Sequence, residues 1–180
     1  FAGLLMSSKG LHTLVESLVI LKKKKIFTRT YIAGANFQKG YQEALKEFLK
    51  KHGLLDSVNF VGSLKRKQLS RLFRLTHVFV FPSIYPEAFG IVQAEAMASG
   101  LALISSGVGG SKELVKHDIN GWLFKNQDPE DLSHKLAELA KKPELIKKFG
   151  INSNKIARTQ FSTMASSEKI ETIFKSFRGL

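Results

Sequence analysis

Apolar residues recur along this chain with two different spacings. Positions three or four residues apart, such as Leu11, Leu14 and Leu18, predict amphipathic helices. Short unbroken runs of apolar or β-branched residues predict strands instead. The expected helices are residues 10–22, 41–52, 68–75 and 90–99, and the expected strands are residues 1–5, 26–33, 58–61, 77–81, 101–104 and 121–124.

The last third of the chain contains a glycine-rich turn and a long helical region. Residues 107–110 form the turn, and a short helix that ends near His117 is expected after it. Asp128 and Pro129 make a good helix start for the remainder of the chain. The expected breaks in that helical region lie near Pro143, Gly150 and Ser162.

Strands and helices alternate along the sequence, which predicts a parallel sheet with helices on both faces. Residues 77–81 and 101–104 are apolar throughout, as is typical of parallel strands that are covered on both faces. The predicted class is therefore α/β, a Rossmann-like domain with a helical tail at residues 143–180. A chain of 180 residues suits one domain that buries roughly 70% of its unfolded surface.

Composition excludes several classes of protein. Hydrophobic residues make up 43% of the chain and charged residues 24%, which excludes global disorder. Cysteine is absent, so disulfides, thiolate metal sites and a cysteine nucleophile are excluded. No apolar run reaches the roughly 18–20 residues of a membrane span, and no signal peptide is recognisable. We therefore expect a cytoplasmic protein.

The formal net charge of +13 is unevenly distributed. Residues 1–75 carry 15 basic and four acidic side chains, whereas residues 76–180 carry 13 and 11. A solvated lysine-rich face, an anionic lipid surface, a nucleic acid or a phosphate-bearing ligand would each fit this asymmetry. A nucleic acid is disfavoured, because aromatic and basic residues do not interleave as on stacking surfaces. The lysines at residues 22–25 are better explained as a solvated helix end.

Three loops follow predicted strands and open predicted helices, namely residues 6–10, 82–90 and 105–111. Ligands of such sheets bind beyond the carboxyl ends of the strands, and a helix N-terminus at a glycine turn favours anions. A tight turn also requires glycine, so each loop alone is weak evidence. No Walker A motif is present, and residues 107–110 lack the spacing of a dinucleotide fingerprint.

Two glutamates mark the middle loop and the helix that follows it. Glu87 precedes the helix and Glu95 lies on it, roughly 12 Å away. Carboxylates that act on one glycosidic bond are about 5–10 Å apart, so these two suit opposite ends of a long ligand such as a nucleotide sugar. The alternative is a helix-capping Glu87 and a surface Glu95. The apolar neighbours Val92, Ala96 and Met97 argue against an idle Glu95.

Residues 87–98 carry the most specific motif of the chain, Glu-Ala-Phe-Gly at 87–90 followed by Glu-Ala-Met-Ala at 95–98. This motif resembles the E-x-F-G and E-A-M-A segments of the family-4 retaining glycosyltransferases. Further similar stretches are residues 1–3, 9–10, 58–62, 81–83, 109–115 and 120–121. The resemblance runs nearly end to end and implies the C-terminal donor-binding domain of the GT-B fold, in which two Rossmann-like domains face a cleft.

The resemblance implies a role for each matching residue. Glu87 would hydrogen-bond the transferred sugar, and Glu95 would bind the nucleotide ribose. Lys9 would neutralise the leaving diphosphate, and Leu64 would lie where the family recognises the base. The remaining implied donor-binding residues are Gly3, Ala88, Phe89, Gly90, Ile91 and Val92, and backbone N–H groups of residues 89–92 would hold the diphosphate. Similar enzymes retain anomeric configuration and use no metal or other cofactor, so cationic groups and the helix dipole act instead.

The first loop departs from the family pattern at Leu4. Family members usually have Gly-Arg-Leu where this chain has Gly3, Leu4 and Leu5. Loss of the charge-assisted bond from that arginine to phosphate costs about 1.5–3 kcal/mol. Three explanations for the missing arginine are open. The donor is bound differently, the protein is a slow or inactive relative, or another basic residue takes the place of the arginine. The candidate substitutes are Lys65, Arg66 and Lys67.

The function that follows is sugar transfer from a nucleotide-diphospho-sugar to a glycan or lipid-linked acceptor, as in polysaccharide or lipopolysaccharide synthesis. Nothing in residues 1–180 resembles the family's N-terminal acceptor domain, and the five histidines lie in no motif that predicts a base. The chain starts at Phe1, so we expect that domain upstream and little activity in the fragment alone. The alternative is a non-catalytic nucleotide-sugar-binding relative or a partner subunit. The basic half would also suit peripheral contact with an anionic membrane at its inner face.

Overall fold

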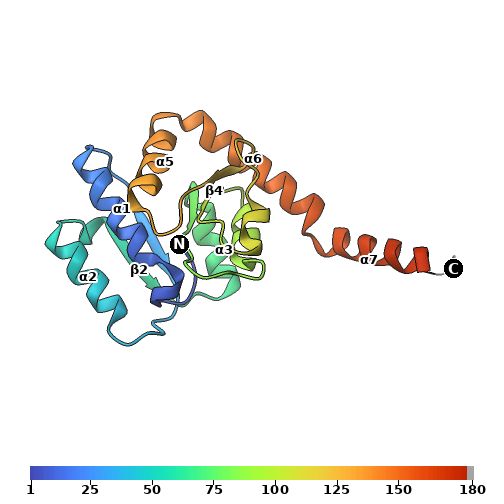
Figure 1. The fold of residues 1–180 in the computed structure, drawn as a ribbon, viewed down its shortest axis with the longest axis horizontal. Coiled ribbons are helices and arrows are strands. Elements are labelled where there is room, and N and C mark those ends of the chain that lie inside the picture. The colour runs from blue at the N-terminus through green and yellow to red at the C-terminus, as the bar shows by residue number, and fades with distance from the viewer. Residues whose placement is uncertain (178–180) are drawn as a thin grey trace.

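The computed structural model describes residues 1–177, whose parallel strands lie between two layers of helices (Figure 1). Strand β1 (Thr30–Ala33) pairs with β2 (Val58–Gly62). In a second sheet, β3 (Val78–Phe81) pairs with β4 (Ala102–Ser105), and β4 pairs with β5 (Gly121–Leu123). All of these pairs are parallel. The predicted class, a Rossmann-like parallel sheet with helices on both faces, is confirmed.

Successive residues of the central strands point to opposite helical layers. Val80 of β3 and Ile104 of β4 belong to one apolar core, whereas Phe79 and Leu103 belong to the other. Both faces are therefore buried, which explains why these strands contain apolar residues at every position.

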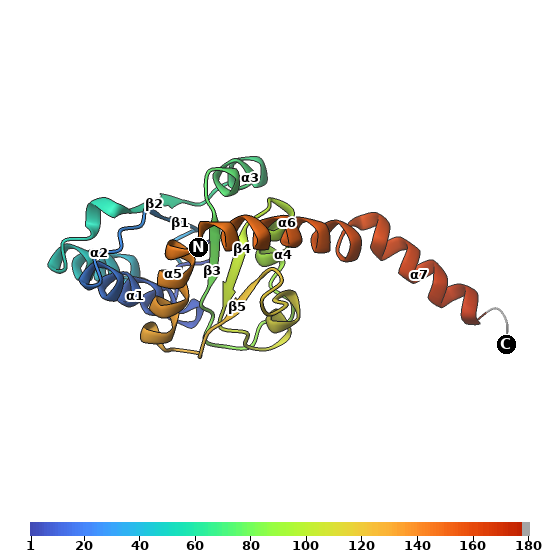
Figure 2. The same ribbon diagram turned by 90° about the horizontal axis from the view of Figure 1, so that it is seen from above.

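The helices divide between the two faces of the sheets (Figure 2). The first core is covered by α1 (Leu11–Lys23), α2 (Tyr41–Lys51) and α5 (Pro129–Lys141). The second core is covered by α3 (Arg66–Arg74) and α4 (Ile91–Ala98). Helix α6 (Pro143–Gln160) contributes to both, with Phe149 in the first core and Ala157 in the second.

The break predicted at Gly150 is wrong, because α6 continues through this residue. Gly150 packs directly on the backbone of Gly100, and a Cβ at Gly150 would lie 2.3 Å from the Gly100 carbonyl oxygen. The glycine therefore permits close packing and does not end the helix. The other two breaks are confirmed, since α6 begins at Pro143 and α7 (Thr163–Phe177) begins just after Ser162.

Three further predictions need correction. The strand expected at 26–33 is shorter and begins at Thr30, after Lys25 adopts a turn with a φ of 59°. The strand expected at residues 1–5 is reduced to two isolated bridges beside β1. The helix expected after the glycine-rich turn is the 3₁₀ helix η3 (Gly110–Leu114), one of three with η1 (Ser7–Lys9) and η2 (Leu55–Ser57) in the described residues.

Helix α7 projects away from the rest of the molecule in Figures 1 and 2. Its exposed apolar side chains include Ile170, Ile173 and Phe174. None of the helices within residues 1–177 is both long and apolar enough to cross a membrane.

Candidate functional site

The first and middle loops interlock at the carboxyl ends of the strands. The Ile84 N–H donates a hydrogen bond of 2.9 Å to the Ser8 carbonyl oxygen. Gly10 has a φ of 65°, and a Cβ there would lie 1.8 Å from the Pro82 carbonyl oxygen. The glycine of the first loop is therefore required where the two loops touch.

The glycine-rich third loop packs on the backbone around Glu87. The Gly110 N–H donates to the Glu87 carbonyl oxygen at 2.8 Å, and the Glu87 N–H donates to Val108 at 3.3 Å. A Cβ on Gly109 would lie 2.6 Å from the Glu87 carbonyl oxygen, and one on Gly110 would lie 2.1 Å from that of Ala88. These glycines allow the third loop to hold Glu87 in place.

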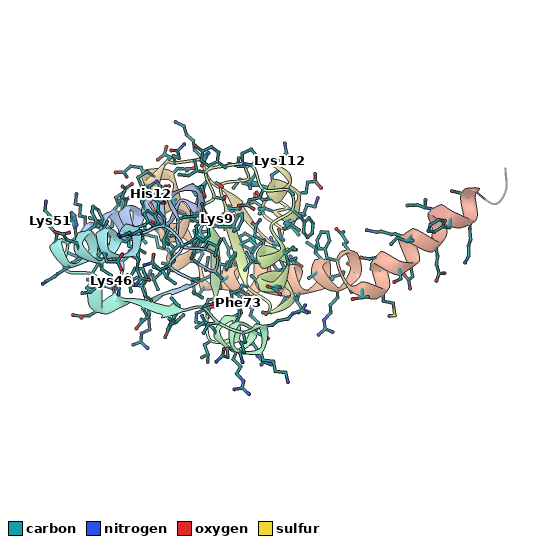
Figure 3. The ribbon with its side chains drawn as sticks, turned by 90° about the horizontal axis from the view of Figure 1, so that it is seen from below. Lys9, His12, Lys46, Lys51, Phe73 and Lys112 are labelled. Atoms are coloured by element: carbon teal, nitrogen blue, oxygen red, sulfur yellow. The ribbon has the colours of Figure 1, made fainter. Side chains whose placement is uncertain are left out.

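The first and middle loops border a hollow of about 300 Å³, near the position of Lys9 in Figure 3. Lys9 and Glu87 form an ion pair at its wall, and 26% and 23% of their side chains are exposed. Most of the implied donor-binding residues line this hollow: Gly3, Lys9, Glu87, Ala88, Phe89, Gly90, Ile91 and Val92.

The N-terminus of α4 opens into the same hollow. Gly90 precedes the helix with a φ of 80°, and its carbonyl oxygen accepts the first helical hydrogen bond from Gln93 at 2.8 Å. The N–H groups of Ile91 and Val92 belong to the first turn and have no acceptor within the helix. The helix dipole and the Lys9 ammonium therefore both favour an anion in this hollow.

Ser83 is a site residue that the sequence analysis missed. Its buried hydroxyl donates to Glu87 Oε1 at 2.9 Å, and its carbonyl oxygen accepts a 2.6 Å hydrogen bond from Ser106 Oγ. The Glu87 carboxylate is thus held by the Lys9 ammonium and the Ser83 hydroxyl together. Pro82 and Ser83 lie in one of the further similar stretches, residues 81–83, but a serine beside proline is also an ordinary turn residue.

Glu95 lies at a second hollow of about 220 Å³, one turn along α4 from Ile91. Arg66, at the start of α3, approaches it with 3.4 Å between Nε and Oε1. Because the Arg66 side chain is 89% exposed, this pair is weak and a ligand can displace it. Leu64 lines neither hollow and packs against the second core instead.

The sequence matches the family described as Glycosyl transferases group 1 over residues 1–156. The chain belongs to this family. Among its relatives, an uncharacterized glycosyltransferase of Methanocaldococcus jannaschii is 37% identical over 131 residues, which make up 71% of this chain and 32% of that protein. The chain spans between 32% and 48% of the length of the first relatives.

Solved glycosyltransferase structures share the fold. Anabaena HepE, crystallised in complex with UDP, has a TM-score of 0.86 at 23% identity over 97% of this chain and 48% of that one. The C-terminal domain of the group 1 protein LpcC from Francisella tularensis has a TM-score of 0.81 at 24% identity over 91% of this chain and 84% of that one. The fold is therefore that of the C-terminal domain of GT-B glycosyltransferases.

Within this glycosyltransferase domain, Leu4 stands where the family pattern has an arginine. Its side chain is 41% exposed and does not line the first hollow. Of the three candidate substitutes, Arg66 is the one that contacts a site carboxylate, whereas Lys65 and Lys67 do not line either hollow.

His12 has a structural partner in this glycosyltransferase domain. Its backbone N–H donates to the Tyr41 hydroxyl at 3.1 Å, and its Nδ1 lies 3.0 Å from the same oxygen. Burial raises the pKa of Tyr41, so the hydroxyl stays neutral and links α1 to α2. Within residues 1–177, no group of three or more His, Asp or Glu side chains is placed to hold a metal ion.

Proposed function

We propose that this chain is the donor-binding half of a retaining glycosyltransferase that uses a nucleotide-diphospho-sugar. The observation that carries the proposal is the Lys9–Glu87 ion pair in a hollow that also receives the N-terminus of α4. A cation, a carboxylate and free amides meet there, which suits a ligand with both phosphates and hydroxyls. Family membership and the similarity to HepE, which was crystallised with UDP, support the proposal.

The proposed reaction begins when the diphosphate enters the first hollow and replaces Glu87 as the partner of Lys9. The ammonium and the α4 amides then stabilise the negative charge that develops on the leaving diphosphate, without a metal ion. Glu87 remains held by Ser83 and accepts hydrogen bonds from the sugar hydroxyls. Glu95 accepts hydrogen bonds from the ribose. The bond between the anomeric carbon and the diphosphate breaks while the acceptor hydroxyl oxygen bonds to that carbon on the same face of the sugar ring, and the hydroxyl proton passes to the leaving phosphate, so the anomeric configuration is retained.

The acceptor site belongs, in this proposal, to polypeptide outside these 180 residues. That polypeptide would form the N-terminal domain and bind a glycan or lipid-linked acceptor in the cytoplasm. The excess of basic side chains in residues 1–75 supports peripheral contact with an anionic membrane. Sedimentation with anionic and neutral vesicles tests this contact, and equal recovery with both would remove it from the proposal.

Glu95→Ala is expected to weaken nucleoside diphosphate binding by about 10- to 150-fold, because a hydrogen bond to a charged group is lost. Calorimetric titration of the 180-residue chain with UDP, GDP and ADP measures this effect. Glu47→Ala, which changes an exposed glutamate on α2, is the matched control and should bind normally. Absence of binding by all three nucleotides, or equal binding by the two variants, would contradict the proposal.

Leu4 favours a second candidate, a non-catalytic relative that binds nucleotide sugar as a partner subunit. An arginine at this position would supply the phosphate contact of the family pattern, so Leu4→Arg should tighten UDP binding about tenfold. Turnover by the full-length protein separates the two candidates. Activity that appears only with Leu4→Arg supports the non-catalytic relative, whereas robust wild-type turnover dismisses it.

A further inference from the structure

Helix α3 lies in the longest stretch of the chain without acidic residues. Residues 57–86 contain no aspartate or glutamate. The stretch contains five basic residues, all of them exposed and all on α3 or at its N-cap: Lys65, Arg66, Lys67, Arg71 and Arg74. The helix therefore has a positive charge that its own sequence does not balance.

Three of these side chains share the side of α3 that faces away from the molecule. Phe73 and the leucines of the helix pack into the second core. Lys67, Arg71 and Arg74 recur at intervals of four and three residues on the opposite side, and they form the basic face of α3. Figure 2 places α3 at the rim of the molecule, and Figure 3 shows side chains of this helix, near Phe73, that project outward.

The charge of the basic face is not compensated within the described part of the chain. Among residues 1–177, no carboxylate forms an ion pair with the basic face, and Arg66 is the one basic residue of α3 that reaches a carboxylate, that of Glu95. Like charges four residues apart, such as Lys67 and Arg71, destabilise a helix. The helix dipole favours the two arginines of the last turn but opposes the cations at the first turn. An anionic partner would offset this repulsion.

An exposed apolar side chain adjoins the basic face. Leu75 follows the last turn of α3, and 74% of it is exposed. A phospholipid bilayer offers apolar interior beneath its headgroup phosphates, which an acidic protein surface or a nucleic acid does not. Residues 65–75 expose no aromatic side chain on which a base could stack, because Phe73 is buried. Cations beside an exposed leucine therefore favour an anionic bilayer as the partner.

A second basic cluster lies at the C-terminal ends of α1 and α2 and has an explanation within the chain. Lys22 Nζ donates hydrogen bonds of 2.7 and 3.0 Å to the carbonyl oxygens of His52 and Gly53. Lys23 and Lys51 lie in the last turns of their helices, where the dipole favours cations. This cluster also precedes β1, so it lies at the amino end of that strand and away from the candidate site.

We propose that the basic face of α3, with Leu75 at its end, is the surface by which the chain contacts an anionic phospholipid bilayer, an assignment that rests on the membrane contact in the proposed function. The helix is roughly 13 Å long and can lie flat on the headgroups. Each lysine or arginine at the surface of an anionic leaflet strengthens binding about fivefold.

This orientation would place the second hollow beside the bilayer. Helix α3 follows β2, so its first turn lies at the edge of the sheets that carries the candidate site. Arg66 of α3 and Glu95 of α4 both line the second hollow. The hollow would therefore lie within about one helix diameter, roughly 10 Å, of the headgroups, and a lipid-linked acceptor would be presented next to the donor.

Co-sedimentation with vesicles of equal parts phosphatidylglycerol and phosphatidylcholine tests the assignment. The triple variant Lys67→Gln, Arg71→Gln, Arg74→Gln is expected to bind these vesicles about 100-fold more weakly than the unchanged chain. Its unfolding temperature should be equal or higher, because repulsion on the helix is relieved and glutamine is a good helix former. Its affinity for UDP should not change, because none of the three side chains lines either hollow.

The matched control is the triple variant Lys23→Gln, Lys24→Gln, Lys51→Gln. It removes the same charge from exposed side chains at the ends of α1 and α2. Its vesicle binding should weaken by less than about tenfold, because charges far from the bilayer are screened by salt.

Leu75→Ser separates a bilayer from a soluble acidic partner. It is expected to weaken vesicle binding about fivefold, because apolar burial is lost, and to leave binding to the polyanion heparin unchanged.

Equal losses for the two triple variants would overturn the assignment, because net charge alone would then explain binding. Vesicle binding that Leu75→Ser leaves unchanged would also overturn it, in favour of a soluble acidic partner. A chain that binds UDP but no anionic vesicle would contradict the membrane contact and leave donor binding standing. Vesicle binding through the basic face without nucleotide binding would support the assignment and count against the donor site.

Discussion

Gly10→Ala is expected to destabilise the chain by at least about 4 kcal/mol, enough to leave much of it unfolded. The added Cβ would lie 1.8 Å from the Pro82 carbonyl oxygen, where no rotamer change can relieve the overlap. The left-handed backbone, with a φ of 65°, adds a further roughly 1–2 kcal/mol. Urea unfolding at equilibrium measures the change in the free energy of unfolding.

Gly40→Ala is the matched control for this substitution. Gly40 precedes α2 with a φ of 77°, but nothing lies within 4 Å of an added Cβ. Only the backbone cost of roughly 1–2 kcal/mol should remain. Similar losses for the two variants would show that the contact between the first and middle loops contributes little.

The 180-residue chain is expected to lose about 4 kcal/mol of stability between pH 8 and pH 5 through the α-amine of Phe1 alone. Burial lowers the pKa of this amine from 8.0 in the unfolded state to about 5 in the folded state. Between these values the unfolded chain binds a proton that the folded chain does not, so acid favours unfolding. The stability is fully present above pH 8 and is lost as the pH falls to 5.

N-terminal acetylation provides the reference for this pH dependence. The acetylated chain keeps an N–H donor for the Tyr31 carbonyl oxygen but cannot be protonated. Subtracting its urea-unfolding free energy from that of the unmodified chain at each pH isolates the amine. The lowered pKa of Asp118 acts below 3.8, and the raised pKa of Tyr41 acts above 10.0, so neither falls in this range. A difference that stays flat from pH 8 to pH 5 would refute the prediction.

Buried strands were the elements most readily predicted from the sequence. Residues 101–104 are apolar at every position because both faces of β4 are covered, and this pattern has few other causes. Residues 26–29 have similar strand-forming side chains, yet pairing begins only at Thr30. Strand pairing needs a partner at the correct distance, which local sequence does not encode.

The glycines also show that local sequence does not encode tertiary contacts. Gly150 would normally suggest a weak point in a helix, but its purpose depends on Gly100, fifty positions earlier in the chain. The sequence suggests that Gly109 and Gly110 belong to a ligand-binding turn, and their closest contacts in the structure are with the backbone of Glu87 and Ala88. In each case the need for glycine arises from tertiary packing.

The candidate site was predictable to the extent that it follows from topology. Parallel strands end at one edge, so the loops with Lys9, Glu87 and residues 107–110 were expected near one another. The motif resemblance then gave the individual roles, which stay predictions. Ser83 was missed because its importance depends on the 2.9 Å distance to Glu87. Leu64 packs against the second core and lines neither hollow, and its expected place beside the base stays a prediction.

The separation of the sheets has a mechanical consequence for ligand binding. Lys9 follows the segment attached to β1, whereas Glu95 is on the helix that follows β3. A ligand held by both would therefore connect the sheet of β1 and β2 to the sheet of β3, β4 and β5. Part of its binding free energy would be used to fix the two sheets relative to each other, so a change that fixes them beforehand would tighten binding without contacting the ligand.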